Sequence, residues 1–127
     1  MAVADINDQK KWEVFVRRLL EKTCEGVVEW NDWSDKVSRS NSQSPFFVAQ
    51  YKHWRILVYR YAYRHFLDDE HFDWEEDVAI ELVDDSGMPG WKLPKVPSRY
   101  SLLDHIEYEH ADVESLYSDI VGDEQDP

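Results

Sequence analysis

The run from Tyr51 to Phe66 constrains the fold of this chain more than any other stretch. It holds four of the seven tyrosines, is rich in aromatic and β-branched residues, and contains no glycine or proline. That composition is typical of β-strands. A single strand of this length would be unusual. We therefore predict a hairpin that turns at Lys52 and His53 and continues as a second strand from Trp54 to Phe66.

The character of this second strand changes along its length. Its first half is apolar on both faces, which predicts burial in the middle of a sheet. In its second half, tyrosines occupy one face and arginines the other. We expect the arginines to pair with carboxylates of the next strand, predicted over residues 77–84. The tyrosine face is formed by Tyr59, Tyr61 and Tyr63.

Helical periodicity precedes the hairpin. Apolar residues recur at spacings of three and four from about Ile6 to Cys24. Asn7 or Asp8 can cap the start of this helix, and Gly26 follows its last turn. The Lys and Arg residues of the segment lie largely off the apolar stripe, so the helix has a basic outer face.

A second helical pattern lies near the C-terminal end of the chain. Ser98 or Ser101 can cap its start, and Gly122 is expected to end it. The apolar periodicity is weakest near residue 110. If the helix is broken, we expect the break at this position.

Shorter segments complete the predicted sheet. Alternating or apolar runs predict strands over 27–30, 46–50, 77–84 and 91–93. Polar and turn residues predict a flexible connection over 34–45, and an acidic loop is expected over 67–76. In the strand over 77–84, alternate apolar residues should face the core while Glu81 faces solvent.

This order of elements predicts an α+β fold: an N-terminal helix, an antiparallel sheet of four to five strands, and a C-terminal helix. Short connections favour antiparallel pairing, and we expect the helices to pack on one face of the sheet. The chain of 127 residues has the size of one domain. We assign residues 1–5 to a flexible start, 6–122 to the single domain and 123–127 to an acidic tail.

The charge of the chain limits its partners. It has 14 Lys and Arg against 27 Asp and Glu, and a formal net charge of −13. This argues against direct nucleic-acid binding and against an anionic membrane surface, because both depend on cations. Cys24 is the only cysteine, and no basic leader or membrane-length apolar run is present. We therefore expect a cytoplasmic protein.

Residue patterns for catalysis or metal binding are weak. The acidic run around His71 lacks the glycine and the terminal glutamate of a calcium loop. His105 and His110 lie five residues apart, whereas a pair of helical zinc ligands needs a separation of three or four. Cys24 follows a helix, where the dipole disfavours a thiolate. We therefore predict no enzyme activity, no cofactor, no metal and no catalytic residue.

The favoured function is a non-enzymatic protein–protein interaction domain, of the adaptor, inhibitor or immunity type. Acidic residues would attract a partner with a basic surface, and exposed aromatic residues would hold it. The predicted partner-binding residues are Asp68, Asp69, Glu70, Asp73, Trp74, Glu75, Glu76, Tyr59, Tyr61 and Tyr63. The sequence leaves the partner and the oligomeric state open.

Two other functions remain open. A nucleic-acid mimic that blocks a DNA-binding protein would need two rows of carboxylates on one face, from residues 68–85 and 104–126. A small-ligand or nucleotide-binding domain would need a concave site in which cationic side chains converge, since arginine pairs well with phosphate. The residues for that site are His53, Arg55, Arg60, Arg64 and His65.

The six tryptophans divide by context. Trp12 and Trp54 fit the predicted core. The remaining four lie in or beside loops, where they either form an exposed aromatic patch or close the ends of the sheet.

The run from Leu19 to Trp30 follows the pattern leucine, three residues, threonine, two residues, glycine, one residue, an aliphatic residue, one residue, tryptophan. It resembles a widespread type of small prokaryotic and phage α+β protein that carries no assigned activity. In those proteins the run joins the end of a helix to a first strand, and a sheet and a C-terminal helix follow. The resemblance implies this fold and a bacterial, archaeal or phage origin, and no functional residue.

Overall fold

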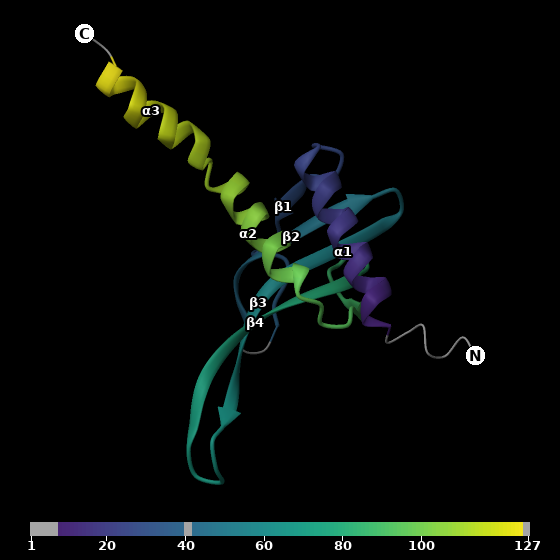
Figure 1. Ribbon diagram of the computed structural model, residues 1–127. Helices are drawn as coiled ribbons and strands as arrows, with labels where there is room; N and C mark the ends of the chain where they lie inside the picture. The colour runs from purple at the N-terminus through teal and green to yellow at the C-terminus, as the bar shows by residue number, and fades with distance from the viewer. Residues whose placement is uncertain (1–7, 40–41, 126–127) are drawn as a thin grey trace.

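A computed structural model describes residues 8–39 and 42–125 of the chain (Figure 1). Three helices and five strands follow the predicted order. They are α1 (Gln9–Cys24), β1 (Trp30–Asp32), β2 (Ser42–Tyr51), β3 (Trp54–Phe66), β4 (Phe72–Val83), β5 (Pro89–Lys92), α2 (Ser98–His110) and α3 (Val113–Gln125). The α+β prediction is confirmed. The predicted loose start over 1–5 and residues 126–127 of the predicted tail lie outside the described residues.

The strands form one antiparallel sheet in the order β1-β2-β3-β4-β5, so each strand pairs with its neighbours in sequence. The predicted turn between β2 and β3 is confirmed, with Tyr51 opposite Trp54. Lys52 adopts the left-handed conformation that this two-residue turn requires, at φ 58°. The bounds predicted for β3 are also confirmed.

Capping residues determine where α1 begins and ends. The Asp8 carboxylate accepts hydrogen bonds from the amides of Lys10 and Lys11 at 3.0 and 3.3 Å, as predicted. Gly26 follows the helix at φ +79°, and the amide of Val27 donates to the carbonyl of Lys22 at 2.9 Å. This is the glycine-terminated helix end that the sequence indicated.

Helices α1 and α2 cover one face of the sheet and enclose the main core. Its fully buried members include Val16 of α1, Val58 of β3 and Leu102 of α2. The predicted break in the C-terminal helix is confirmed, because Ala111 and Asp112 separate α2 from α3. Asp112 has φ 55°, which interrupts the helix. Beyond it, α3 extends away from the body (Figure 1).

A second, smaller core covers the opposite face of the sheet. Val37, which follows a short turn that begins at Trp33, is buried against Leu57 and Tyr59 of β3. The prediction of a flexible connection over 34–45 is therefore wrong for its first half, and β2 starts earlier than expected, at Ser42. The prediction that Glu81 faces solvent is also wrong, because its side chain is buried in this second core.

Several element bounds differ from those predicted. Residues 72–76 belong to β4, so the acidic loop is confined to 67–71. The first strand begins at Trp30, because the amides of Val27 and Val28 still bond to the end of α1. Gly122 does not end the last helix, which runs on to Gln125. The last strand lies over Pro89–Lys92, a shift of about two residues.

Candidate functional site

Strands β3 and β4 extend beyond the rest of the sheet as a two-stranded arm. Their pairing runs from Ile56 opposite Leu82 to Phe66 opposite Phe72. The pairing of β2 with β3 stops at Tyr61, and β5 pairs with β4 only near its C-terminal end. Among the described residues, the strands between Ala62 and Glu76 therefore pair only with each other. We call residues 62–76 the arm, and Figure 1 shows it projecting from the body.

One face of the arm carries aromatic side chains and one arginine. Phe66 lies opposite Phe72, and Arg64 lies opposite Trp74. The rings of Phe66 and Phe72 are 5.6 Å apart, and Phe72 meets Trp74 edge-on at 5.8 Å. The Arg64 guanidinium lies 5.4 Å from the Phe72 ring centre, in cation–π range. These cross-strand pairs stabilise an arm that has no core of its own.

This aromatic face is open to solvent. Phe66 is 57% exposed and Trp74 is 59% exposed. Leu67, at the start of the loop, is also exposed. A contiguous exposed group of this kind is uncommon on a monomer and often marks an interaction site. Trp74, which was predicted to bind a partner, therefore lies on an accessible surface.

The tip of the arm is a compact acidic turn. The Asp68 carboxylate accepts hydrogen bonds from the amides of Glu70 and His71 at 2.8 and 2.9 Å. The bond from the Glu70 amide, followed by the bond from the His71 side chain, lowers the pKa of Asp68. Asp69 and Glu70 are exposed beside it. The tip therefore presents negative charge directly next to the aromatic face.

The three predicted surface tyrosines lie on the other face of β3, at different depths. Tyr59 is only 3% exposed and belongs to the second core, so it cannot form part of a binding surface. Tyr61 is half-buried, and its hydroxyl donates to Asp77 at 3.4 Å. Tyr63 is exposed and donates to Glu75 at 2.8 Å, a bond that raises the pKa of Tyr63. Only Tyr63 therefore remains as a surface residue of this set.

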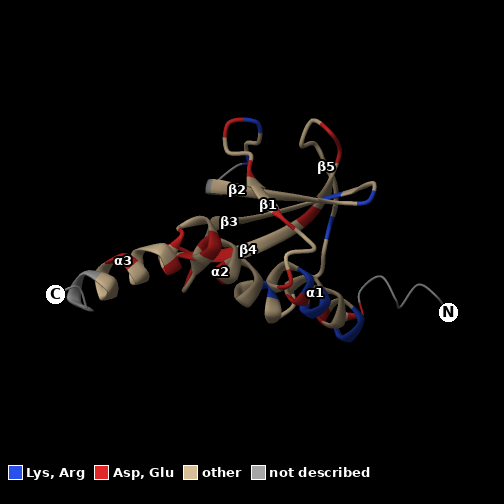
Figure 2. Cartoon of the chain, turned by 90° about the horizontal axis from the view of Figure 1, so that it is seen from above, with Lys and Arg blue, Asp and Glu red and all other residues tan. Residues whose placement is uncertain are grey.

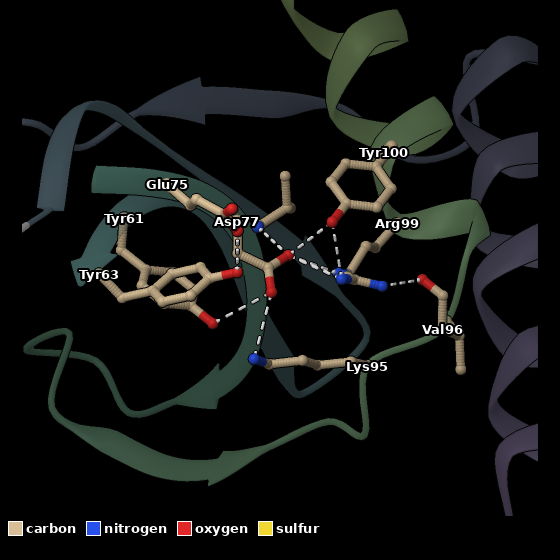
Figure 3. Close-up of polar contacts among 9 residues, drawn as sticks. Tyr61, Tyr63, Glu75, Asp77, Lys95, Val96, Arg99 and Tyr100 are labelled. Carbon is tan, nitrogen blue, oxygen red and sulfur yellow. Dashed lines mark hydrogen bonds and ion pairs between the residues drawn. The ribbon is translucent and has the colours of Figure 1, made fainter. Parts of the chain in front are cut away.

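The base of the arm is held by a buried carboxylate, that of Asp77 (Figure 3). Arg99 of α2 donates to it at 2.7 Å, the Tyr100 hydroxyl at 2.9 Å, and the Lys95 ammonium lies 3.1 Å away. The amide of Val78 also donates to it, at 2.7 Å. Burial acts to raise the pKa of Asp77, but these donors outweigh it and hold the pKa well below its usual range. Asp77 therefore joins the arm to α2 as an ionised structural acceptor.

A second buried carboxylate, Glu81, stabilises the opposite face of the sheet. It accepts hydrogen bonds from the Tyr59 hydroxyl and, at 3.1 Å, from Arg39. Arg39 also donates to the carbonyl of Gly87 at 2.8 Å. Burial and the bond to Glu81 raise the pKa of Tyr59 far above its ordinary value. No sequence pattern indicated this cluster, because alternation alone placed Glu81 toward solvent.

The cationic residues proposed for a small-ligand site do not converge. Arg55 pairs with Asp85, and Arg60 of β3 pairs with Glu107 of α2 at 2.5 Å. Arg64 lies over the rings of the arm, as described above. His53 and His65 lie at opposite ends of β3. The ring centre of His53 is 4.4 Å from that of Trp54, and His65 is exposed.

The carboxylates required for nucleic-acid mimicry occupy different environments. Asp77 and Glu81 are buried. Asp104 and Glu107 of α2 both lie within ion-pair distance of Arg60. The other acids are spread over β4, α2, α3 and several loops, while basic residues gather on α1 (Figure 2). This distribution does not reproduce two parallel rows of phosphates.

A Cys–His contact lies between α1 and α2, but its geometry does not suit nucleophilic catalysis. The Cys24 Sγ is 3.6 Å from His105 Nε2, and the same nitrogen is 2.7 Å from Glu109 Oε1. A catalytic histidine needs one ring nitrogen for the nucleophile and the other for the orienting carboxylate. Here a single nitrogen faces both groups, so the histidine cannot relay a proton between them.

Comparisons with known proteins yield no relative: no family model, no curated protein and no solved structure matches the chain. The resemblance of the run from Leu19 to Trp30 therefore stays a prediction. Within residues 8–39 and 42–125, no group of three or more potential ligands is placed to hold a metal ion. None of the helices in these described ranges has both the length and the apolar character to cross a membrane.

Proposed function

We propose that this protein is a non-enzymatic interaction domain that binds a protein partner through its arm. The observation that carries the proposal is the exposed aromatic face of Phe66, Phe72 and Trp74 on a projecting hairpin. Trp and other aromatic residues supply much of the binding energy at protein interfaces. A hairpin with three exposed aromatic side chains gains more by burying them in a partner than by remaining in water.

The charge of the arm indicates the chemistry of the partner. The tip and β4 side of the arm carry six acidic residues, Asp68, Asp69, Glu70, Asp73, Glu75 and Glu76, within a chain of net charge −13. Such a surface attracts a partner whose binding groove is lined by cations, and charge of this kind acts mainly on association rate and selectivity. We place this interaction in the cytoplasm, where the one cysteine stays reduced.

The experiment is affinity capture from cells that express the protein natively, with three forms compared in parallel. The Phe66→Ser/Trp74→Ser double variant removes two of the three rings of the aromatic face and changes no residue of either core. Met88→Ser is the matched control, because Met88 is equally exposed but lies in the β4–β5 turn. We expect to capture a protein that binds both the wild type and the Met88→Ser control. Its affinity for the double variant should be at least about tenfold lower.

Two further measurements define the result. Circular dichroism should show that the double variant keeps the wild-type fold, so that lost binding reports on the surface. Raising the salt from about 0.05 to 0.5 M should slow association with the captured partner, because exposed charges are screened. If no captured protein distinguishes the double variant from the Met88 control, the arm is not a binding surface and the proposal fails.

A further inference from the structure

Helix α3 presents an apolar face that nothing in the described chain covers. Leu116, Tyr117 and Ile120 are 60%, 64% and 56% exposed. Leu116 and Ile120 are one helical turn apart and Tyr117 adjoins them, so the three share one side of the helix. Figure 1 shows α3 continuing away from α2 and from the sheet. An isolated helix of 13 residues is marginal in water and usually depends on packing of its apolar face.

A groove beside α1 offers an apolar site of matching character. It has a volume of about 310 Å³ and lies between α1 and the β2–β3 turn. We call it the α1 groove, and its lining residues include Trp12, Phe15, Tyr51, Trp54, Ile56 and Leu82. The sequence placed Trp54 in the core, but this side chain is 50% exposed at the groove.

The charges of α1 and α3 are complementary. Helix α1 carries five Lys or Arg against two Glu, and Arg18 and Lys22 of this set line the groove itself. The sequence of α3 contains four acids and no Lys or Arg. Glu114 and Asp119 of α3 are exposed. In a chain that is acidic overall, the one basic helix therefore borders the groove, and the helix with the exposed apolar face is acidic.

From these observations we infer that α3 of one copy docks into the α1 groove of a second copy, with the apolar side chains of α3 buried and its acids near Arg18 and Lys22. In Figure 1, α3 runs away from α1 of its own chain. A twofold axis lets each copy insert its helix into the other. An amphipathic helix in an apolar groove is a common mode of recognition. This dimer uses neither the arm nor the surface proposed for the partner.

The test measures the mass of the full chain in solution by sedimentation equilibrium over a range of concentrations. We expect a monomer–dimer equilibrium for the wild type. The Leu116→Asp/Ile120→Asp variant changes only the exposed face of α3, and Trp54→Asp places an acid at the groove. Each should raise the dimer dissociation constant at least about tenfold. Val14→Asp is the matched control, because Val14 is exposed on α1 and does not line the groove.

A mixing experiment separates this arrangement from other dimers. The α3 variant keeps an intact groove, and the Trp54 variant keeps an intact helix. An equimolar mixture should therefore form a heterodimer with one working contact, although each variant alone is monomeric. A wild type that stays monomeric at all concentrations overturns the inference, because α3 then does not dock on a second copy. A dimer that survives Trp54→Asp assigns the contact to α3 pairing with itself and also overturns the inference. A mixture without heterodimer overturns it as well, because an intact α3 then does not bind an intact groove.

Discussion

Asp77 combines two properties that a surface acid does not have: its side chain is buried, and every group around it is a donor. An ionised carboxylate in such a place is favourable only while its partners remain, because burial by itself disfavours charge. Arg99 is almost as buried, with 11% of its side chain exposed. The Asp77–Arg99 pair therefore joins β4 to the start of α2. Removing either partner would leave the other charge buried without its counter-ion.

We predict that Asp77→Asn lowers the free energy of unfolding by about 3 kcal/mol, since it leaves the buried Arg99 charge without its counter-ion. Urea denaturation followed by circular dichroism measures this change. Asp69→Asn is the control, because Asp69 is exposed at the tip of the arm. Its effect should stay within about 0.5 kcal/mol. Equal effects of the two substitutions would contradict the structural role of Asp77.

The same residue predicts a dependence on pH. The pKa of Asp77 in the folded state is held below the value of about 3.9 for a free Asp. A carboxyl with a lowered pKa contributes stability that is fully present above its unfolded pKa and is lost as the pH falls toward its folded pKa. The difference in stability between the wild type and Asp77→Asn should be constant from about pH 6 to 8 and should shrink below about pH 4. A difference that persists unchanged to pH 2.5, about 1.4 units below the free-Asp value, would contradict this assignment.

At the level of single elements, two glycines show how location changes the effect of one substitution. Gly26 ends α1 at φ +79°, a conformation that residues with a Cβ adopt only at a cost. Gly122 lies within α3, has an ordinary backbone, and has no atom within 4 Å of a Cβ added there. The first glycine is required by the backbone, whereas the second only weakens its helix.

We predict that Gly122→Ala raises the helical signal at 222 nm, because alanine favours a helix interior over glycine by about 0.5–1 kcal/mol. At a protein concentration where the chain is monomeric, the midpoint of global unfolding should not change, since the exposed face of α3 contributes nothing to either core. Gly26→Ala should instead lower the free energy of unfolding by about 1 kcal/mol. If Gly122→Ala shifts the global midpoint as much as Gly26→Ala does, α3 is packed on the body of its own chain.

The molecule as a whole consists of a packed body and two projections. The body is the sheet between its two cores, covered by α1 and α2 on one side and by the segment around Val37 on the other. The arm and α3 leave the body at different places (Figure 1). Elements with few buried apolar contacts open with a small free energy, whereas core strands open only with global unfolding.

Hydrogen exchange should show this division. In dilute solution, amides of β3 from Ile56 to Arg60 should exchange only through global unfolding. Amides of the arm from Arg64 to Asp73, and those of α3, should exchange at least about a hundredfold faster. At high concentration, α3 should gain protection as the dimer forms, while the arm should not. Mass spectrometry of proteolytic fragments resolves these regions, and arm protection equal to that of the central β3 amides would contradict the two-part description.

The elements themselves were largely predictable from local patterns. The β3 bounds, the turn at Lys52, the cap at Asp8 and the glycine after α1 follow from residue preferences that act over a few positions. The projection of the arm had a weaker signal in the sequence. The predicted strand from Trp54 to Phe66 is longer than the predicted strands on either side of it, so part of it had to extend beyond the sheet.

The positions of the polar side chains could not be predicted in the same way. Asp77 and Glu81 belong to the same acidic region as the exposed residues of the arm, and alternation places all four of Asp73, Glu75, Asp77 and Glu81 on one face of β4. Whether such a carboxylate is buried depends on what reaches it from elsewhere. Arg99 comes from α2 and Arg39 from the loop after β1, so only the folded chain brings them to β4.

The run from Tyr51 to Phe66 thus determined a hairpin, its turn and its alternation, because these depend on neighbouring residues. The tertiary structure decided which of its tyrosines are buried, which of its arginines are paired with acids, and how far its second strand extends beyond the sheet. These outcomes depend on contacts between segments that are distant in sequence. The same holds for the α1 groove and the exposed face of α3, whose charges are evident in the sequence but whose accessibility is set by how the helices pack.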